Sequence, residues 1–572
     1  MTIFQREKGR GNAPSDQTPV PGAYFRKHPS VPHLCDQNEY RNLYQKSIES
    51  PDQFWSSMAT ACLKWDVLFD TVHHGSFEDG NHGWFLGGKL NACYNCVDRH
   101  ALDNPDKLAI LYERDDPEDV PQRFTYGELL RDVSKLSWVL KDLGVQKGDI
   151  VTIYLPNVPE AVVAMLACAR IGAVHSVVFA GFSAPSLRGR LDDARSRVII
   201  TADQGVRGGK FVPMKNVVED ALADHEGPKL RCLVLRITEN PVPWSQRSTD
   251  FWWHEECARW PGYCEPVSMG AEDPLYMLYT SGSTGKPKGL MHTTAGYLLS
   301  CAVSGKYVLD LHPSDTMFCA GDVGWITGHN YLVYTPLVLG TTTVVFEGTP
   351  AYPDYDRFWQ ILNRCEASHF YAAPTALRMI KKTRPNGSIK PLERLRVIAS
   401  IGEPLAPSVW QWCYEELGRK EAHVLDTYFQ TETACHAFSP LAAVTPTKPG
   451  VPFFGFQPAI VEPDSGKEIE GGEGRGLLVF KQPWPGIART VWGDHARYMK
   501  TYFEEHKGYF VTGDSAYRDQ DDYYSILGRV DDVVNISGHR LSTAEIESAL
   551  LDHGAFAEVA VVGVQDQLTG RH

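Results

Sequence analysis

The stretch YTSGSTGKPKG (residues 279–289) is the most informative part of the sequence. It follows an apolar segment with the composition of a buried strand. Its glycines allow the backbone to approach an anion closely, its hydroxyls can donate hydrogen bonds, and its lysines add positive charge. The GxxxxGK[ST] spacing of a Walker A loop is absent, so GTPase or kinase chemistry is not implied. The stretch predicts a phosphate-binding loop at the end of a strand, with a flexible Gly/Ser linker as the alternative.

The chain around this loop alternates between strand and helix patterns, which is typical of βαβ units around a mainly parallel sheet. Thr125 and Glu128 form a capping box, and apolar residues follow at three-and-four spacing until Gly144, so we expect an amphipathic helix. Pro159 opens the next helix. Strands are expected at IVTIYL, AVHSVVF, RVIIT, LRCLVLR, LYMLYT, TTTVVF and HFYAAP. The pattern predicts an α/β fold with ligands at the carboxyl ends of the strands.

Length and charge limit the classes of partner. A chain of 572 residues is too long for one hydrophobic core. Its 56 Lys plus Arg and 70 Asp plus Glu give a formal net charge of -14, which repels nucleic acid. No stretch approaches the roughly 18 apolar residues of a membrane span. We therefore expect neither a nucleic-acid nor a membrane partner, and we read residues 1–20, polar and rich in Pro and Gly, as a disordered tail without a secretion signal.

The 13 cysteines are scattered singly through the chain, which predicts reduced thiols and a location in the cytoplasm, or also in the nucleus. Cys93 and Cys96 form one CxxC pair near His100. This pair lacks the second pair of ligands that a closed zinc site needs, so packing is favoured over metal binding.

Five further stretches follow the loop: YAAPTALR (371–378), SIGEPL (400–405), DTYFQTET (426–433), TGD (512–514) and GRVDDVVNISGHR (528–540). In this order they resemble the core motifs of adenylate-forming enzymes, which include acyl-CoA synthetases, peptide-synthetase adenylation domains and luciferases. WITGH (325–329), AGFSAPSLRGR (180–190) and the long amino-terminal region resemble the acetyl-CoA synthetase family, over essentially the whole chain. The resemblance implies a large multi-subdomain adenylation domain at residues 1–530, followed at 531–572 by a hinge and the start of a small α+β lid domain.

The reaction implied by this resemblance is the ATP-dependent ligation of acetate to coenzyme A. The acid attacks the α-phosphate to give acetyl-AMP and pyrophosphate, and the CoA thiol then displaces AMP. ATP, CoA, a short-chain acid and Mg²⁺ are the expected small-molecule partners, and a homo-oligomer is compatible with the sequence.

Two residues in these motifs are chemically suited to hold the nucleotide. The Asp514 carboxylate can accept hydrogen bonds from both ribose hydroxyls, and Arg529, an always-charged fork, can hold the ribose or phosphate end. By resemblance, further nucleotide contacts come from the loop (Thr280, Ser281, Gly282, Ser283, Thr284, Gly285, Lys286), from the adenine pocket (Gly402, Glu403, Pro404), from the groove (Asp426, Thr427, Tyr428, Phe429, Gln430, Thr431) and from Arg540.

The resemblance also assigns the chemistry. It places Thr280, Lys288, Glu432 and Asp531 among the catalytic residues. Glu432 is a suitable carboxylate for Mg²⁺, with an ordinary surface acid as the alternative. Asp531 resembles the hinge about which the lid rotates, although an ordinary turn fits the same residues. His553 resembles a residue near a bound cation, and a surface or packing role fits it equally well.

A net-acidic protein needs a local basic recess for the phosphates of CoA. The string GVRGGK supplies Arg207 and Lys210 around Gly208 and Gly209, whereas two such cations alone are usually only a solvated face. The resemblance makes this string a CoA contact and adds Thr327, Ala373 and Ser537.

The acid pocket is implied by resemblance to lie among Ile326, Thr327, Ile401 and Phe429. The family ordinarily has Trp at the position of Phe429, so phenyl opens volume that the two isoleucines partly refill. Propionate, or even butyrate, therefore stays open as an alternative to acetate.

Members of the family carry a lysine late in the lid that binds the carboxylate and the α-phosphate. The sequence ends at His572 before such a residue, so we expect a truncated form of a longer chain. Two rival functions remain: an adenylating enzyme that passes its acyl group to a carrier protein or to oxygen, and a non-catalytic nucleotide or acyl-adenylate sensor.

Overall fold

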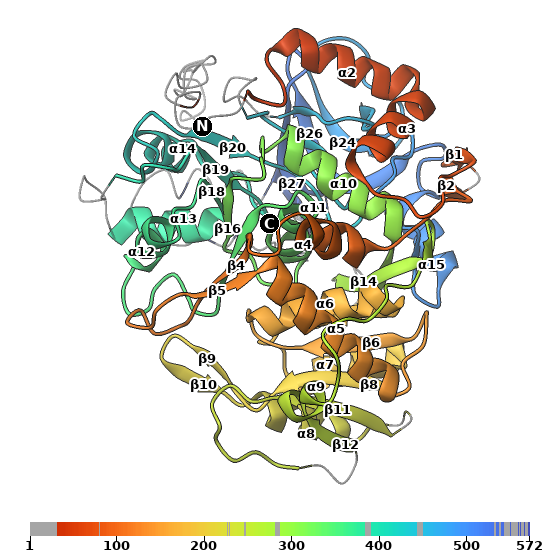
Figure 1. Ribbon diagram of the computed structural model, residues 1–572. Helices are drawn as coiled ribbons and strands as arrows, with labels where there is room; N and C mark the ends of the chain where they lie inside the picture. The colour runs from red at the N-terminus through yellow and green to blue at the C-terminus, as the bar shows by residue number, and fades with distance from the viewer. Residues whose placement is uncertain are drawn as a thin grey trace.

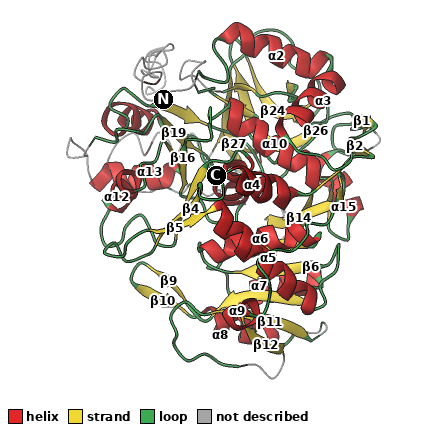
Figure 2. Cartoon of the chain, in the orientation of Figure 1, coloured by secondary structure: helices red, strands yellow, loops and turns green. Residues whose placement is uncertain are grey.

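The computed structural model describes Tyr24, residues 31–78, 80–225, 227, 229–244, 248–280, 287–383, 391–442 and 450–530, and short stretches beyond residue 530. Figure 1 shows two large sheets, one in the lower half of the view and one in the upper left, with helices packed against them. A third sheet lies in the upper right. Figure 2 separates these strands from the helices by colour.

The first large sheet has eight strands in the order β12-β11-β8-β6-β7-β14-β15-β25. The strands from β12 to β14 run parallel, and β15 and β25 run antiparallel to their neighbours. The bounds are β6 Ile150–Tyr154, β7 Val174–Val177, β8 Val198–Ala202, β11 Leu230–Leu235, β12 Ser248–Trp252, β14 Pro274–Thr280, β15 Lys288–Thr293 and β25 Thr490–Val491.

The second large sheet has seven strands in the order β20-β19-β18-β16-β17-β4-β5, all parallel except for β5 at one edge. The bounds are β4 Leu108–Glu113, β5 Gln122–Thr125, β16 Thr316–Cys319, β17 Thr342–Phe346, β18 His369–Ala372, β19 Val397–Ser400 and β20 His423–Asp426. The mainly parallel α/β architecture expected from the sequence is confirmed.

The third sheet is antiparallel, in the order β23-β24-β26-β27, with bounds β23 Pro458–Val461, β24 Gly474–Phe480, β26 Phe510–Arg518 and β27 Tyr524–Arg529. A fourth, in the order β29-β28-β31-β30, lies beyond residue 530 (β28 Val533–Ile536, β29 His539–Ser542, β30 Gln565–Asp566, β31 Gly570–Arg571). Short pairs complete the strands: β1 Thr71–Gly75 with β2 His82–Leu86, β3 Lys89–Leu90 with β13 Met269–Gly270, β9 Gly205–Arg207 with β10 Lys210–Val212, and β21 Phe438–Ser439 with β22 Val451–Pro452.

Helix α5 begins and ends where the sequence predicts. The Thr125 side chain accepts a hydrogen bond from the Glu128 N–H and the Glu128 carboxylate accepts one from the Thr125 N–H, which satisfies two N-terminal donors. Gly144 follows the helix with a φ of +76°. The helices are α2 Gln37–Glu49, α3 Pro51–Cys62, α4 Arg99–Asp103, α5 Tyr126–Asp142, α6 Pro159–Ile171, α7 Ala184–Ala194, α8 Met214–Leu222, α9 Trp253–Ala258, α10 Thr294–Tyr307, α11 Thr335–Val338, α12 Arg357–Arg364, α13 Pro374–Thr383, α14 Pro407–Trp412 and α15 His495–Tyr502.

Cys93 and Cys96 are fully buried in the core. The Arg170 guanidinium donates to the Cys93 sulfur over 3.5 Å, and burial raises the pKa of Cys93 to about 12, which favours the neutral thiol. A buried, neutral thiol favours packing over metal binding at this CxxC pair. Among the described residues, no helix combines the length and the apolar character needed to cross a membrane.

Candidate active site

The predicted phosphate loop connects two antiparallel strands, β14 and β15. Their register places Thr280, the last residue of β14, directly opposite Lys288, the first residue of β15. The hydroxyl of Thr280 is buried and has no hydrogen-bond partner among the described residues. Residues 281–286 lie outside the described residues. Both ends of the loop are therefore fixed by the sheet, and a free hydroxyl and an ammonium group flank it.

Lys288 belongs to a buried chain of polar groups. Its Nζ donates a hydrogen bond of 2.9 Å to the hydroxyl of Tyr502 at the end of α15, and this hydroxyl donates to the Glu432 carboxylate. Burial lowers the pKa of Lys288, and the nearby carboxylate of Glu432 acts in the opposite direction. The chain Lys288–Tyr502–Glu432 therefore joins a strand, a helix and the QTE string, which lie 70 or more residues apart in sequence.

Asp514 lies at the centre of a second polar group. Its Oδ2 accepts hydrogen bonds from the Tyr428 hydroxyl (2.6 Å) and from Gln430 Nε2 (2.5 Å). Arg529, opposite Asp514 in the β26–β27 register, places its Nη1 3.6 Å from Oδ1. Burial raises the pKa of Asp514, and the hydrogen bond from Tyr428 and the charge of Arg529 oppose this rise. The structure thus joins the TGD, DTYFQTET and GRVDD motifs at one carboxylate.

The residues predicted for the adenine pocket, Gly402, Glu403 and Pro404, follow strand β19. Gly402 has a φ of +102°, and a Cβ built there meets open space, so this residue leaves room beside the chain. The exposed Glu403 is held by the hydroxyl of Thr375 and by Arg378, each at 2.6 Å. Pro404 is exposed beside it.

Asp426 is the last residue of the neighbouring strand β20, and the buried Thr427 follows it. The Leu405 N–H donates to Asp426 Oδ2 over 3.2 Å, and burial raises the pKa of Asp426 to about 7. The Thr427 hydroxyl donates to the Ser400 carbonyl over 2.7 Å. Thr431, one of the residues predicted for the nucleotide groove, is half-buried.

The predicted acid-pocket residues come from three loops that follow strands. Phe429 is buried and meets Tyr331 and His436 edge-on, with ring centroids 5.5 Å and 5.4 Å apart. Ile401 is buried, and Ile326 and Thr327 are half-buried on the segment before Tyr331. The rings of Tyr331 and His436 therefore pack against Phe429 and set the position of its side chain.

Arg207, one of the predicted CoA residues, lines a cavity between the two large sheets. Arg207, Asn157, Asp322 and Gly348 are among its lining residues. The Arg207 guanidinium lies 5.9 Å from the ring centre of Phe179. Lys210 and Ala373 are exposed, and the Thr327 carbonyl accepts a contact from Cys319, which also lines the cavity.

Several predicted residues cannot be placed. Asp531, Ser537 and His553 lie outside the described residues, and Arg540 is described only as part of strand β29. Their roles stay predictions.

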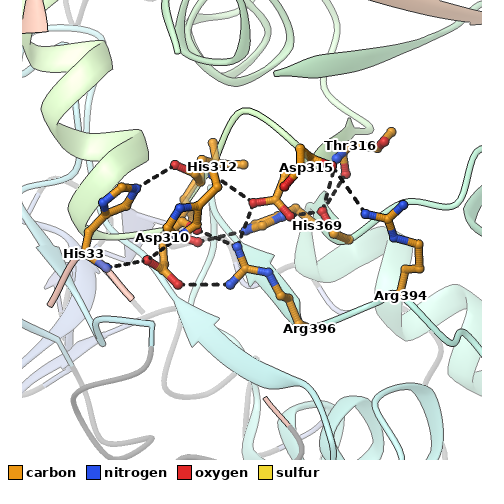
Figure 3. Close-up of polar contacts among 12 residues, drawn as sticks. His33, Asp310, His312, Asp315, Thr316, His369, Arg394 and Arg396 are labelled. Carbon is orange, nitrogen blue, oxygen red and sulfur yellow. Dashed lines mark hydrogen bonds and ion pairs between the residues drawn. The ribbon is translucent and has the colours of Figure 1, made fainter. Parts of the chain in front are cut away.

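A candidate cation site lies elsewhere in the molecule. Ligand atoms of His33, Asp310 and His312 lie within 4.8 Å of one another, and Figure 3 shows them together with Arg396. The Asp310 carboxylate, however, already accepts hydrogen bonds from Arg396 (3.0 Å) and from Tyr24 (2.7 Å). A metal ion here would be repelled by the buried guanidinium, so this group fits an anchor for the amino-terminal segment better than a metal site.

Sequence motifs did not indicate Tyr502 or Asp322. Tyr502 ends a helix outside every motif, and no spacing rule relates it to Lys288 or Glu432. Asp322 lies in the cavity wall, and burial raises its pKa to about 6. A carboxylate in the loop that follows strand β16, in GDVGW, was the signal that could have indicated it.

Two family models match this chain over consecutive ranges. A family model described as AMP-binding enzyme matches residues 97–492, and one described as acetyl-coenzyme A synthetase N-terminus matches residues 40–96. A solved structure of acetoacetyl-CoA synthetase from Streptomyces lividans superposes with a TM-score of 0.83 at 26% identity, covering 92% of this chain and 80% of that one. The fold and the site thus define an AMP-binding, adenylate-forming enzyme.

Relatives of higher sequence identity identify the family within this class of enzymes. The chain is 57% identical over 556 residues to acetyl-coenzyme A synthetases from Penicillium chrysogenum and Emericella nidulans, covering 96% of this chain and 82% of each relative. It is 52% identical over 558 residues to acetyl-coenzyme A synthetase 2 from Saccharomyces cerevisiae, covering 96% and 81%. The chain belongs to the acetyl-coenzyme A synthetase family.

Proposed function

We propose that this protein ligates acetate to coenzyme A at the expense of ATP, through an acetyl-AMP intermediate. The observation that carries the proposal is the convergence of two polar groups, Lys288–Tyr502–Glu432 and the Asp514 cluster, on motif residues of a chain 57% identical to acetyl-coenzyme A synthetases. This relationship favours acetate ligation over longer acids and over a non-catalytic sensor.

The first half-reaction joins two anions. An oxygen of the acetate carboxylate attacks the α-phosphorus, the bond to the β-phosphate oxygen breaks, and pyrophosphate leaves. Thr280 and Lys288 supply a hydroxyl and a positive charge at the two ends of the phosphate loop, which lowers the repulsion between the reactants. We assign Asp514, with Arg529 beside it, to the ribose, because its Oδ1 is not used by Tyr428 and Gln430.

Glu432 fits a divalent cation. One of its oxygens accepts the hydrogen bond from Tyr502, and no described residue donates to the other. Such a half-buried carboxylate oxygen is a suitable ligand for Mg²⁺, which would neutralise charge on the triphosphate when bound.

The second half-reaction consumes the anhydride. The CoA sulfur attacks the acetyl carbonyl carbon, the bond to the AMP oxygen breaks, and the thiol proton is released. Arg207 lines the cavity and Lys210 pairs with it across the β9–β10 hairpin, so both are suited to the phosphates of CoA.

The test measures the two half-reactions separately. With full-length protein, ATP–pyrophosphate exchange is expected only when acetate is present, and rapid AMP release is expected only when CoA is added. Exchange without acid, or AMP release that CoA does not accelerate, would exclude this function. Parallel rates with propionate and butyrate rank the acids.

A further inference from the structure

The β9–β10 hairpin, which carries Arg207 and Lys210, turns through two glycines. Arg207 pairs with Lys210, so Gly208 and Gly209 form a two-residue turn, with φ of +61° and +72°. Two consecutive positive φ values define a tight type I′ turn, which glycine adopts without strain. A Cβ at Gly209 would also lie 2.7 Å from the Tyr352 ring. The turn therefore requires glycine on both conformational and steric grounds.

The turn is held by a carboxylate from the other large sheet. Asp115 follows β4 and is 2% exposed. Its Oδ1 accepts a hydrogen bond from the Gly208 N–H and its Oδ2 accepts one from the Gly209 N–H, both at 2.7 Å. Figure 1 shows the hairpin below β4 and β5, at the edge of the molecule. Both acceptor atoms of one buried anion are thus directed at this turn.

The residues packed around Asp115 leave its carboxylate little room to move. A Cβ at Gly348 would lie 2.7 Å from Asp115 Oδ1, so this glycine permits the close approach. Gly348 and Arg207 both line the cavity between the sheets, whereas Asp115 does not line it. The carboxylate therefore does not contact a ligand in the cavity directly, and its two hydrogen bonds connect it to the hairpin that carries Arg207.

We propose that Asp115 is a positioning residue for coenzyme A, which fixes the Gly208–Gly209 turn so that Arg207 and Lys210 are held toward the phosphates of the bound nucleotide. This inference rests on the proposed function. Without the two hydrogen bonds, the turn loses its anchor on the other large sheet, and the two exposed cations lose their fixed direction.

Asp115→Asn and Asp115→Ala test the proposal. Asparagine keeps one acceptor and places an NH₂ group against an N–H, and alanine removes both acceptors. A hydrogen bond to a charged group is typically worth about 10- to 100-fold in binding, so we expect KM for CoA to rise by about tenfold or more in both variants. The acetate-dependent pyrophosphate exchange should keep its rate and its KM for ATP, because adenylation does not use the hairpin.

Asp116→Ala is the matched control. Asp116 is the exposed neighbour in the same loop, and its carboxylate accepts from the Glu118 N–H, not from the hairpin. Arg207→Ala combined with Asp115→Ala should raise KM for CoA by less than the product of the single effects, because both act through one contact. If Asp115→Ala is unfolded at the assay temperature, the test uses Asp115→Asn, which keeps the shape of the side chain.

The outcomes are distinct. An unchanged KM for CoA in the folded Asp115→Asn variant, or an equal loss of pyrophosphate exchange, overturns the positioning role. The positioning role is also overturned if the rise in KM for CoA in the Arg207→Ala and Asp115→Ala double variant equals the product of the two single rises. Loss of acetate-dependent exchange in the unmutated protein would instead contradict the proposed function.

Discussion

At the scale of single residues, the hydroxyl of Tyr502 connects Lys288, at the end of the phosphate loop, with Glu432. Tyr502→Phe removes this hydroxyl and keeps the ring stacked on Phe510, 5.3 Å away. We expect the rate of acetate-dependent pyrophosphate exchange to fall about 10- to 100-fold, as for the loss of a hydrogen bond to a charged group. The Lys288 ammonium would lose an acceptor, so its pKa should fall further and the alkaline limb of the pH–rate profile should move to lower pH.

Tyr126→Phe is the control for this change. Tyr126 is also buried, and its hydroxyl donates to the Thr341 carbonyl over 2.9 Å, away from the site. This variant should lose some stability and keep the rate and the pH profile. If the two variants behave alike, Tyr502 has only a structural role.

Phe429 carries the prediction on acid selectivity. Phe429→Ala removes the ring that Tyr331 and His436 support, and the space is open to longer acids. A buried methylene contributes about 0.8 kcal/mol, so butyrate, with two more methylenes than acetate, should gain about 15-fold in kcat/KM relative to acetate. The measurement is the ratio of the two kcat/KM values. An unchanged ratio in a folded variant would show that another residue closes the pocket.

The motif residues at this scale were predictable because their chemistry is local: Asp514 and Arg529 are recognisable in TGD and GRVDD. Tyr502 was not predictable, because its role depends on α15 meeting β15 and the QTE string in space.

At the scale of elements, helix α5 follows local rules and should respond to a local change. Thr125→Ala removes the side-chain acceptor for the Glu128 N–H, which typically costs about 1 kcal/mol. We expect the free energy of unfolding to fall by this amount while KM for ATP stays unchanged. Urea unfolding together with the exchange assay measures both.

Thr125→Ser, which restores the acceptor, should recover most of the stability. A Thr125→Ala variant as stable as the unmutated protein would mean that tertiary packing alone holds the end of the helix. The β14–β15 register is a different case: local patterns predicted β14, but only pairing with β15 places Thr280 opposite Lys288.

At the scale of the whole molecule, buried histidines make the fold sensitive to acid. Burial lowers the pKa of His436 and of His292 to about 3, and that of His329 and of His369 to about 4. In the unfolded chain these groups return to about 6.5, so between these values the unfolded state binds protons that the folded state excludes. Stability is therefore full above about pH 6.5 and falls as the pH drops toward 4.

The expected result is a steady fall of Tm from pH 7 to pH 5, measured by scanning calorimetry at constant ionic strength. The loss is on the order of 1–2 kcal/mol per buried histidine at pH 5. A Tm that is flat over this interval would show that these side chains are protonated, or exposed to solvent, in the folded protein.

The sequence by itself determined the α/β class, helix α5, most of the strands and the identity of the motif residues, because these depend on periodicity, capping and composition over a few neighbouring residues. Only the tertiary structure decided which motifs share a side chain, such as Asp514 with Tyr428 and Gln430, and which distant groups serve them, such as Tyr502 and Asp115. The physical reason is that hydrogen bonds act over about 3 Å, and closeness in space between residues tens to hundreds of positions apart is set by the packing of sheets, which no local pattern encodes.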